Sequence, residues 1–300
     1  MNEPKTGLVV RGVGGLYLVA LDDGEAVKCR ARGRFRRDNI QIMVGDRVGV
    51  QRQETGMPVI DALLPRKNAL IRPAVANIDT LVVIASAAAP VTAPLLIDKV
   101  SAIAGHKGID MLLCLNKCDL ARGEDLAKIY EHAGFSVLYT SAVTGEGIEQ
   151  LREKLSAGVF VLTGNSGVGK SSIINCLDPS WQARTGEISE RIGRGRQTTR
   201  HVELFRLPSG AYIADTPGFS SFDISRMDLV LREDLAHAFR DFAPYLGLCR
   251  YRGCTHRTEA DCAVKQALED GEIEKSRYES YLALFDSMKD LHEWELPKPQ

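Results

Sequence analysis

The amino-acid sequence predicts an α/β protein with a small β-rich domain before its main sheet and a helical domain after it. Three observations support this. Short strand-like runs separated by turn residues fill the first 68 residues, strand-like and helix-like runs alternate from residue 78 onward, and helix-like runs around a group of cysteines close the chain. A chain of 300 residues is long enough for a mid-sized domain with additions at both ends. We therefore expect domains at residues 1–68, 69–225 and 226–300.

The composition is that of an ordinary soluble globular chain. Hydrophobic residues make up 44% of it, charged residues 26%, and the net charge is −1. The best candidate for a membrane span, residues 81–89, has about half of the roughly 18 apolar residues that such a helix needs, and Pro90 ends it. The N-terminus lacks the charged start, apolar centre and cleavage site of a secretion signal. These features predict a cytoplasmic protein without a membrane partner.

The first 68 residues predict a small Greek-key barrel. Strand-like runs cover residues 7–13 and 16–21, and Asp22, Asp23 and Gly24 form a hairpin signal. A longer strand is expected at residues 25–35, where cations alternate with small or apolar residues. Further strands are expected at residues 43–50 and 59–64.

The cations of this domain gather in one stretch. Residues 28–37 include six basic side chains and no acidic one, and strand alternation places most of them on one face. A basic face suits a nucleic-acid phosphate backbone, so the expected domain is an OB-fold that binds RNA. A solvated surface strand, or a β-domain used only for packing, is the alternative. A second basic group follows later in the chain, at Arg191, Arg194, Arg196 and Arg200.

A change of pattern marks the start of the second domain. Residues 65–73 are polar and bracketed by prolines, which is typical of a linker. A buried-strand run at 78–85, a helix-like run at 95–105 and another strand run at 110–115 then follow one another. Strands that alternate with helices predict a parallel sheet.

A phosphate-binding loop is the most informative motif. The strand-like run at 159–162 leads into the pattern G-x-x-x-x-G-K-S, and a helix-like segment follows. Glycines let backbone N–H groups converge on phosphate oxygens, and the helix directs its positive end at them. We expect Lys170 to reach the β- and γ-phosphates and Ser171 to ligate Mg²⁺, against the alternative of a chance glycine-rich turn. The candidate nucleotide-binding residues here are Gly164, Asn165, Ser166, Gly167, Val168, Gly169, Lys170, Ser171 and Ser172.

Two loops that precede this motif predict that the base is guanine. Asn116, Lys117 and Asp119 belong to an N-K-x-D tetrad, in which the Asp119 carboxylate can accept hydrogen bonds from N1–H and the 2-amino group of guanine. We expect Asn116 to tie the loop together or to reach the base, and the stem of Lys117 to lie across it. After the next strand run, the loop with Ser141 and Ala142 supplies a backbone N–H for the guanine O6. The tetrad argues against the alternative of a P-loop kinase or ATPase.

The remaining nucleotide motifs follow the phosphate loop. Residues 185–200 are rich in glycine and arginine, which is typical of a switch in which Thr198 or Thr199 adds an Mg²⁺ ligand. An ordinary surface loop is the alternative. Asp215 and Gly218 belong to a D-x-x-G motif, whose carboxylate holds Mg²⁺ through water and whose glycine N–H meets the γ-phosphate.

The order of these motifs predicts a circular permutation. In the usual GTPase order the phosphate loop comes first and the base-recognition loops come last, whereas here the loops at 116–119 and 139–142 precede the loop at 164–171. The amphipathic run at 147–155 leads directly into the phosphate-loop strand and so joins the old ends. The middle domain is therefore expected to be a circularly permuted P-loop GTPase domain.

The seven cysteines, an odd number, do not predict a disulfide framework. Between helix-like runs at 228–242 and 264–294 stands the pattern C-x4-C-x-H-x5-C. Three thiolates and one imidazole fill the tetrahedral shell of Zn²⁺ and leave no open position, so we expect one structural zinc ion rather than scattered buried cysteines. The predicted ligands are Cys249, Cys254, His256 and Cys262.

With these motifs, the chain resembles the RsgA (YjeQ) family of small-ribosomal-subunit-dependent GTPases over essentially its full length. The resemblance rests on the N-terminal barrel, the Pro-Arg-Lys-Asn sequence at 65–68, the three nucleotide motifs and the cysteine–histidine cluster. It implies a bacterial cytoplasmic GTPase that uses Mg²⁺ and binds the small ribosomal subunit and its rRNA late in assembly. It also implies hydrolysis that is slow alone, stimulated by the subunit and coupled to release. We expect a monomer.

One position departs from the family pattern. The family usually carries histidine before its paired threonines, where this chain has Gln197. Phe219, which follows the D-x-x-G motif, cannot orient a water molecule, and this motivates the hypothesis that Gln197 does so through its amide. The alternative is that Gln197 is only a polar switch residue and that rRNA or a backbone group positions the water. A rival function is an RNA-binding assembly checkpoint in which GTP hydrolysis only times dissociation.

Overall fold

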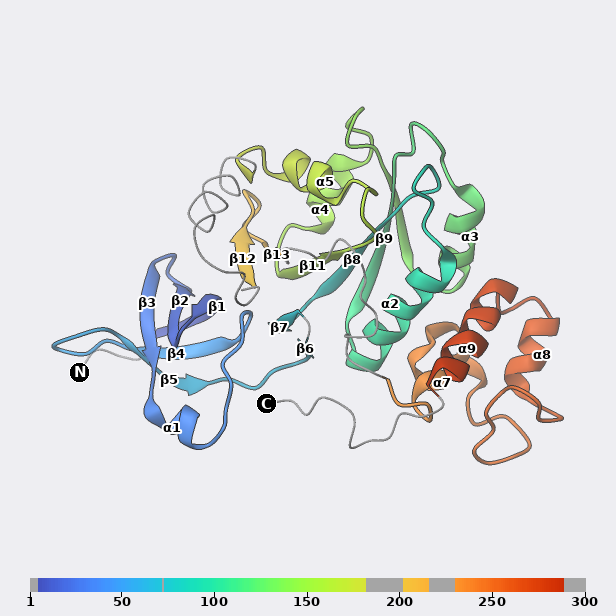
Figure 1. Ribbon diagram of the computed structural model, residues 1–300, viewed down its shortest axis with the longest axis horizontal. Coiled ribbons are helices and arrows are strands. Elements are labelled where there is room, and N and C mark those ends of the chain that lie inside the picture. Colours follow the sequence, from blue (N-terminus) through green and yellow to red (C-terminus); the bar gives the residue numbers. More distant parts are fainter. Residues whose placement is uncertain (1–4, 72, 182–201, 216–229, 289–300) are drawn as a thin grey trace.

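The computed structural model of the chain describes residues 5–71, 73–181, 202–215 and 230–288 (Figure 1). In this part of the chain, no helix is long and apolar enough to cross a bilayer. Eleven strands join in one sheet that runs from the middle domain into the N-terminal barrel, in the order β10-β9-β8-β11-β13-β12-β1-β2-β3-β5-β4.

The N-terminal segment forms the predicted five-stranded barrel. Strand β1 pairs with β2, β2 with β3, β3 with β5, β5 with β4, and β4 returns to β1. The interior is filled by apolar side chains that alternate along the strands, and Val9, Val19, Val48 and Ile60 are fully buried there. The strands are β1 (Lys5–Val13), β2 (Leu16–Leu21), β3 (Ala26–Ala31), β4 (Arg47–Gln51) and β5 (Val59–Leu63).

Two predicted strand boundaries in the barrel are wrong. The strand expected to reach residue 35 ends at Ala31, and helix α1 (Gly33–Arg37) follows because the chain turns to bury Phe35 in the barrel. The strand expected from residue 43 begins only at Arg47, because the Asp46 carboxylate accepts the Met43 N–H at 2.6 Å and closes a turn before it. Three of the six predicted cations therefore lie on α1 instead of on a strand, namely Arg34, Arg36 and Arg37.

The segment predicted as a linker makes hydrogen bonds with both the barrel and the middle domain. Arg66 donates from Nε and Nη2 to the two carboxylate oxygens of buried Asp46, at 2.6 and 2.8 Å. The side chain of Asn68 pairs with the backbone of Ile78, and Asn77 donates to the Gly45 carbonyl at 2.9 Å. Between them, β6 (Ala69–Ile71) and β7 (Ala74–Ala76) form a separate two-stranded sheet. Hydrogen bonds thus attach the segment between the barrel and the middle domain to both of them.

The middle domain contains the predicted parallel sheet, which is covered on both faces. Helices α2 (Pro94–Lys107) and α3 (Glu124–His132) pack on one face, and α4 (Ile148–Lys154) and α5 (Lys170–Leu177) pack on the other (Figure 1). The parallel strands are β8 (Thr80–Ala85), β9 (Asp110–Asn116), β10 (Ser136–Thr140), β11 (Val159–Thr163) and β13 (Tyr212–Asp215), with β12 (Glu203–Arg206) antiparallel beside β13.

The connectivity is that of the predicted circular permutation. Strands β9 and β10, which carry the base-recognition motifs at their ends, precede the phosphate-loop strand β11 in sequence and lie in the same sheet. Helix α4 ends at Lys154 and β11 starts at Val159, so a short turn joins them. Strand β12 also pairs with β1 of the barrel, where Arg11 lies opposite Glu203.

The C-terminal segment is helical but more broken than predicted. Helix α7 (Leu235–Ala238) ends because Phe239 has an extended backbone, and a 3-10 helix η2 (Arg240–Tyr245) follows. The run expected at 264–294 is split into α8 (Ala263–Glu269) and α9 (Lys275–Ser287), and Gly271 takes a left-handed φ of +78° in the turn between them. Residues 228, 229 and 289–294 of the two predicted runs lie outside the described residues.

A fully buried arginine joins this segment to the middle domain. Arg277 of α9 pairs with Asp98 of α2 at 2.8 Å and with Asp241 of η2 at 2.6 Å. Tyr130 of α3 donates to the same Asp98 carboxylate at 2.8 Å. Four elements therefore share one buried network of charges and hydrogen bonds.

Candidate functional site

The phosphate loop connects β11 to α5 through backbone that only glycine can adopt at two places. Gly164 has φ +144°, and a Cβ there would lie 2.0 Å from the Ile84 carbonyl oxygen. Gly169 has φ +98°, and a Cβ there would lie 2.3 Å from Nδ2 of Asn116. The loop is therefore pressed against β8 at its start and against the tetrad at its end.

The basic and hydroxyl side chains of the motif lie where α5 begins. The ammonium of Lys170 donates to the backbone carbonyls of Gly164 and Asn165, each at 2.6 Å. Burial lowers the pKa of Lys170. Ser171 and Ser172 are exposed in the first turn of the helix, where the helix dipole favours anions. Lys170 and the two exposed serines thus lie together at the N-terminal, positive end of α5.

Asn116 links the phosphate loop to the two base-recognition loops. Its Nδ2 donates to the Val168 carbonyl at 2.7 Å, and its Oδ1 accepts from the Ala142 N–H at 3.3 Å and from Thr140 Oγ1 at 3.4 Å. The side chain is only 2% exposed. Asn116 was expected either to tie the loop together or to reach the base, and these hydrogen bonds correspond to the first role.

The other tetrad side chains are more accessible. Lys117, with a left-handed φ of +64°, donates its ammonium to the Ala89 carbonyl at 2.7 Å, and Asp119 is exposed. Ser141 is buried, and its hydroxyl accepts the N–H groups of Val143 and Thr144 at 3.3 and 3.1 Å. The Ser141 hydroxyl therefore shapes its own loop.

Two residues that the sequence analysis did not single out brace these loops. Arg122 donates to Glu146 at 3.1 Å, and its guanidinium lies 4.7 Å from the centre of the Tyr139 ring. This bridge joins the loop after β9 to the loop after β10. In the sequence, Arg122 stands three residues after the tetrad and Glu146 five residues after Ser141. Their opposite charges hint at a pair, but nothing in the spacing predicts the contact.

Several predicted site residues cannot be placed. Gln197, Thr198, Thr199 and Gly218 lie outside the described residues, as does the second basic group at 191–200. The backbone of Asp215 is described and ends β13, beside β11 and at the same edge of the sheet as Gly164.

The four predicted metal ligands converge. One donor atom from each lies within 4.8 Å of all the others, although the residues come from a loop and the start of α8. Nδ1 of His256 lies 3.5 Å from Sγ of Cys249 and 3.4 Å from Sγ of Cys262, and those two sulfurs lie 3.9 Å apart. Two sulfurs bound to one zinc at about 2.3 Å in tetrahedral geometry lie about 3.8 Å apart. The donor set fits Zn²⁺.

The surroundings hold this cluster in place. Tyr278 and Tyr281 of α9 donate to the carbonyls of His256 and Thr255, at 2.7 and 2.8 Å. Burial lowers the pKa of His256, which favours the neutral imidazole that binds metals. Burial raises the pKa of Glu259, but hydrogen bonds from Thr255 and nearby backbone N–H groups outweigh this and lower it to about 2.

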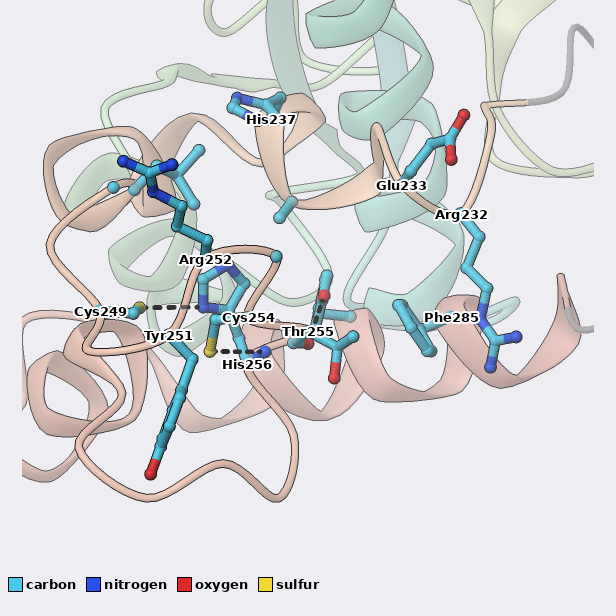
Figure 2. A pocket seen from close by; sticks show the side chains of 15 residues that line it. Arg232, Glu233, His237, Cys249, Tyr251, Arg252, Cys254, Thr255, His256 and Phe285 are labelled. Atoms are coloured by element: carbon cyan, nitrogen blue, oxygen red, sulfur yellow. Dashed lines mark hydrogen bonds between the residues drawn. The ribbon is translucent and has the colours of Figure 1, made fainter.

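A cavity of about 790 Å³ lies beside the cluster (Figure 2). Cys249, Cys254 and His256 form part of its wall, and the guanidinium of Arg232 lies 4.2 Å from the ring centre of Phe285 at another part. Among the described residues, those that line this cavity all belong to the C-terminal segment, so it is separate from the phosphate loop.

Two family models match the chain. The RsgA N-terminal domain matches residues 6–60, and the RsgA GTPase matches residues 63–225. The chain is 42% identical over 287 residues to the small ribosomal subunit biogenesis GTPase RsgA of Caldanaerobacter subterraneus, covering 95% of this chain and 96% of that protein. It is 38% identical to the protein of the same name from Thermotoga maritima, covering 95% and 97%.

Two solved structures of similar proteins also match the chain. YjeQ from Thermotoga maritima superposes with a TM-score of 0.82 at 35% identity, covering 96% of this chain and 100% of that chain. YloQ, which is described as a circularly permuted GTPase, superposes with a TM-score of 0.79 at 31% identity, covering 96% of each chain.

Proposed function

Because the chain belongs to the RsgA GTPase family and is a GTP-hydrolysing enzyme, we propose that it acts in the late maturation of the small ribosomal subunit. It binds the subunit and its rRNA, its hydrolysis is stimulated by the subunit, and hydrolysis is coupled to release. Its place of action is the cytoplasm, and it works as a monomer. The relatives' name, small ribosomal subunit biogenesis GTPase, supports the partner.

The observation that carries the nucleotide assignment is the link from Asn116 to Val168, which brings the tetrad and the phosphate loop to one edge of the sheet. In this arrangement Asp119 selects guanine through N1–H and the 2-amino group, and Lys117 lies across the base. The loop with Ser141 and Ala142 closes the pocket around O6.

The phosphates bind to the loop at 164–169 and to the first turn of α5. Lys170 contacts the β- and γ-phosphates, which requires its ammonium to leave the two carbonyls that it now contacts. Ser171 and a threonine, Thr198 or Thr199, ligate Mg²⁺, and Asp215 with Gly218 senses the γ-phosphate. Gln197 orients the attacking water in this proposal.

The C-terminal cluster holds one structural zinc ion through Cys249, Cys254, His256 and Cys262. Its complete donor set leaves no position for substrate, which supports a role in stability. The domains span residues 1–68, 69–225 and 226–300, and the first binds rRNA through its exposed cations. All six side chains from Lys28 to Arg37 that carry this charge are exposed.

The test is hydrolysis of GTP and ATP by the full chain, with and without purified small ribosomal subunits, for the wild type and Lys170→Ala. We expect GTP-selective turnover that the subunit raises many-fold and that the variant loses. Equal use of ATP would exclude guanine selection. GTP turnover that is the same with and without the subunit would support the GTPase activity and contradict the proposed partner.

A variant that binds GTP without hydrolysing it separates the proposal from the checkpoint alternative. Gln197→Ala serves this purpose if it keeps nucleotide affinity and loses subunit-stimulated turnover. If maturation proceeds while the variant stays bound to the subunit, hydrolysis only times dissociation. If Gln197→Ala hydrolyses GTP normally on the subunit, the proposed role of Gln197 is wrong.

A further inference from the structure

Residues 86–92, which follow β8, form a short segment with a fixed shape. Thr92 N–H donates to the Ser86 carbonyl at 2.9 Å, and Ser86 N–H donates to Thr92 Oγ1 at 3.0 Å. The Ser86 hydroxyl donates to the Ala88 carbonyl at 2.9 Å and accepts the Ala88 N–H at 3.1 Å. Ser86 is 0% and Thr92 1% exposed. Two buried hydroxyls therefore define a turn made mostly of small residues.

This turn contacts three parts of the nucleotide site. The Ala89 carbonyl accepts the ammonium of Lys117 at 2.7 Å. A Cβ added at Gly167 of the phosphate loop would lie 3.2 Å from Cγ of Pro90. A Cβ added at Gly123, in the loop after the tetrad, would lie 2.7 Å from Cβ of Ala87. The segment thus lies between the phosphate loop and the base-recognition loop.

The contact with Lys117 has a direct effect on that side chain. A lysine side chain has four rotatable bonds and loses substantial rotamer entropy when it is fixed. A carbonyl held rigidly at 2.7 Å selects one position for the ammonium and so restricts the conformations of the stem. Interactions that are already ordered cost less on binding, and they strengthen the complex mainly by slowing dissociation.

We infer that residues 86–92 are a positioning element of the guanine-nucleotide site, which holds Lys117 in place through the Ala89 carbonyl and so slows nucleotide release. This inference rests on the proposed function, in which Lys117 lies across the base. No motif covers the segment, because its contacts use backbone carbonyls and small side chains.

The first test is the rate at which the full-length protein releases a fluorescent GDP analogue into excess GDP. Thr92→Val keeps the branched shape and removes the hydroxyl that accepts the Ser86 N–H, and Ser86→Ala removes the second hydroxyl. We expect each variant to release the analogue roughly tenfold faster, since a buried hydrogen-bonding group loses its partner. Ser209→Ala is the matched control, because its hydroxyl also makes two backbone hydrogen bonds, to Leu155 and Ala211, in the turn between β12 and β13.

The second test asks whether the effect passes through Lys117. Lys117→Met keeps the apolar stem and removes the ammonium. In that background we expect Thr92→Val to add no further acceleration, whereas a general loosening of the site would add its full effect.

The outcomes separate the two claims. If the wild type retains the analogue and both hydroxyl variants release it at the wild-type rate, the inference is overturned and the proposed function stands. Equal acceleration by Thr92→Val with and without Lys117 also overturns it. If the wild type itself does not bind the analogue, the proposed function fails and the inference fails with it.

Discussion

The side-chain amide of Asn116 donates a 2.7 Å hydrogen bond to the backbone carbonyl of Val168, which lies 52 residues further along the chain. The same side chain accepts the Ala142 N–H, so one buried residue joins three loops. The three loops are distant in the sequence, and they meet because the strands that precede them lie in one sheet. Asn116 therefore fixes the position of the phosphate loop relative to the two loops proposed to bind the base.

Replacing Asn116 with Ala should weaken binding of GTP and GDP alike. The Val168 carbonyl and the Ala142 N–H would lose their partner, at a cost of about 1–3 kcal/mol, or roughly 5- to 150-fold in affinity. Equilibrium titration with a fluorescent guanine nucleotide measures this. Gln266→Ala, which removes an exposed amide hydrogen bond from α8 to Asp270 at its C-terminal end, should leave the affinity unchanged. An Asn116→Ala protein that binds GDP normally would contradict the linking role.

Replacing Asp119 with Asn should change the base preference. An amide cannot accept from both N1–H and the 2-amino group of guanine, but it can donate to the 2-oxo group of xanthine. We expect GTP affinity to fall by at least about a hundredfold and the preference to move toward xanthosine triphosphate. Competition between the two nucleotides for the same protein sample measures the ratio. An unchanged preference for GTP would show that Asp119 does not contact the base.

Removing the metal should destabilise the C-terminal segment. The expected zinc content is one ion per chain, and Cys254→Ser should lower it because the hydroxyl is a poorer ligand. Since metal binding is coupled to folding, chelation or Cys254→Ser should lower the stability of this segment by several kcal/mol, a part of the about 10–16 kcal/mol by which structural Zn²⁺ binds to zinc-finger peptides. Metal analysis together with thermal unfolding measures both effects.

Cys176→Ser is the control for this experiment. Its sulfur contacts the Ala142 carbonyl at 3.5 Å, far in sequence from the cluster, so zinc content should not change. A wild-type protein that carries no zinc when purified without chelator, and whose stability ignores added zinc, would contradict the prediction.

Breaking the buried charge network should have a large and pH-dependent effect. Arg277→Met would leave the carboxylates of Asp98 and Asp241 buried without their cation, which costs about 3–5 kcal/mol at neutral pH. Arg250→Met removes an exposed ion pair with Asp261 and should cost less than about 1 kcal/mol. Denaturant unfolding at pH 7 gives both values.

The pH dependence of the Arg277→Met variant has a defined sign. Burial already raises the pKa of Asp98 despite Arg277, and without the arginine the pKa should rise further. A carboxyl with a raised pKa binds its proton more tightly in the folded state, so stability falls as pH rises from the unfolded-state pKa toward the folded-state value. The variant should therefore recover part of its lost stability as the pH is lowered through the folded-state pKa of Asp98. A loss that is constant with pH would contradict this.

The sequence predicted those parts of the molecule that depend on local pattern. The phosphate loop between β11 and α5, the closed barrel and the convergent metal ligands follow from motif spacing and alternation, and each is present in the structure. The error at residues 32–35 arose because alternating cations suggested a strand, whereas burial of Phe35 favoured a turn of helix. Tertiary contact decided between two locally acceptable conformations.

Features that depend on distant contacts were not predictable in this way. Arginine is usually exposed, so nothing in the sequence around Arg277 indicates a fully buried side chain with partners 36 and 179 residues away. The contacts of the segment at 86–92 were not predictable either, because its small residues match no functional motif. Backbone carbonyls such as that of Ala89 acquire their importance only from the fold.

The pairing of β1 with β12 makes the barrel part of the main sheet. Strand β1 pairs with β4 through its first residues and with β12 at Arg11, and its register with β2 shifts between Val9 and Arg11. Backbone hydrogen bonds do not depend on side-chain identity, except at proline. This junction should therefore tolerate most substitutions during evolution. Proline at Arg11 or Glu203, or an inserted residue that changes the register, would break this pairing and leave the contacts of Arg66 and Asn77 to hold the barrel to the middle domain.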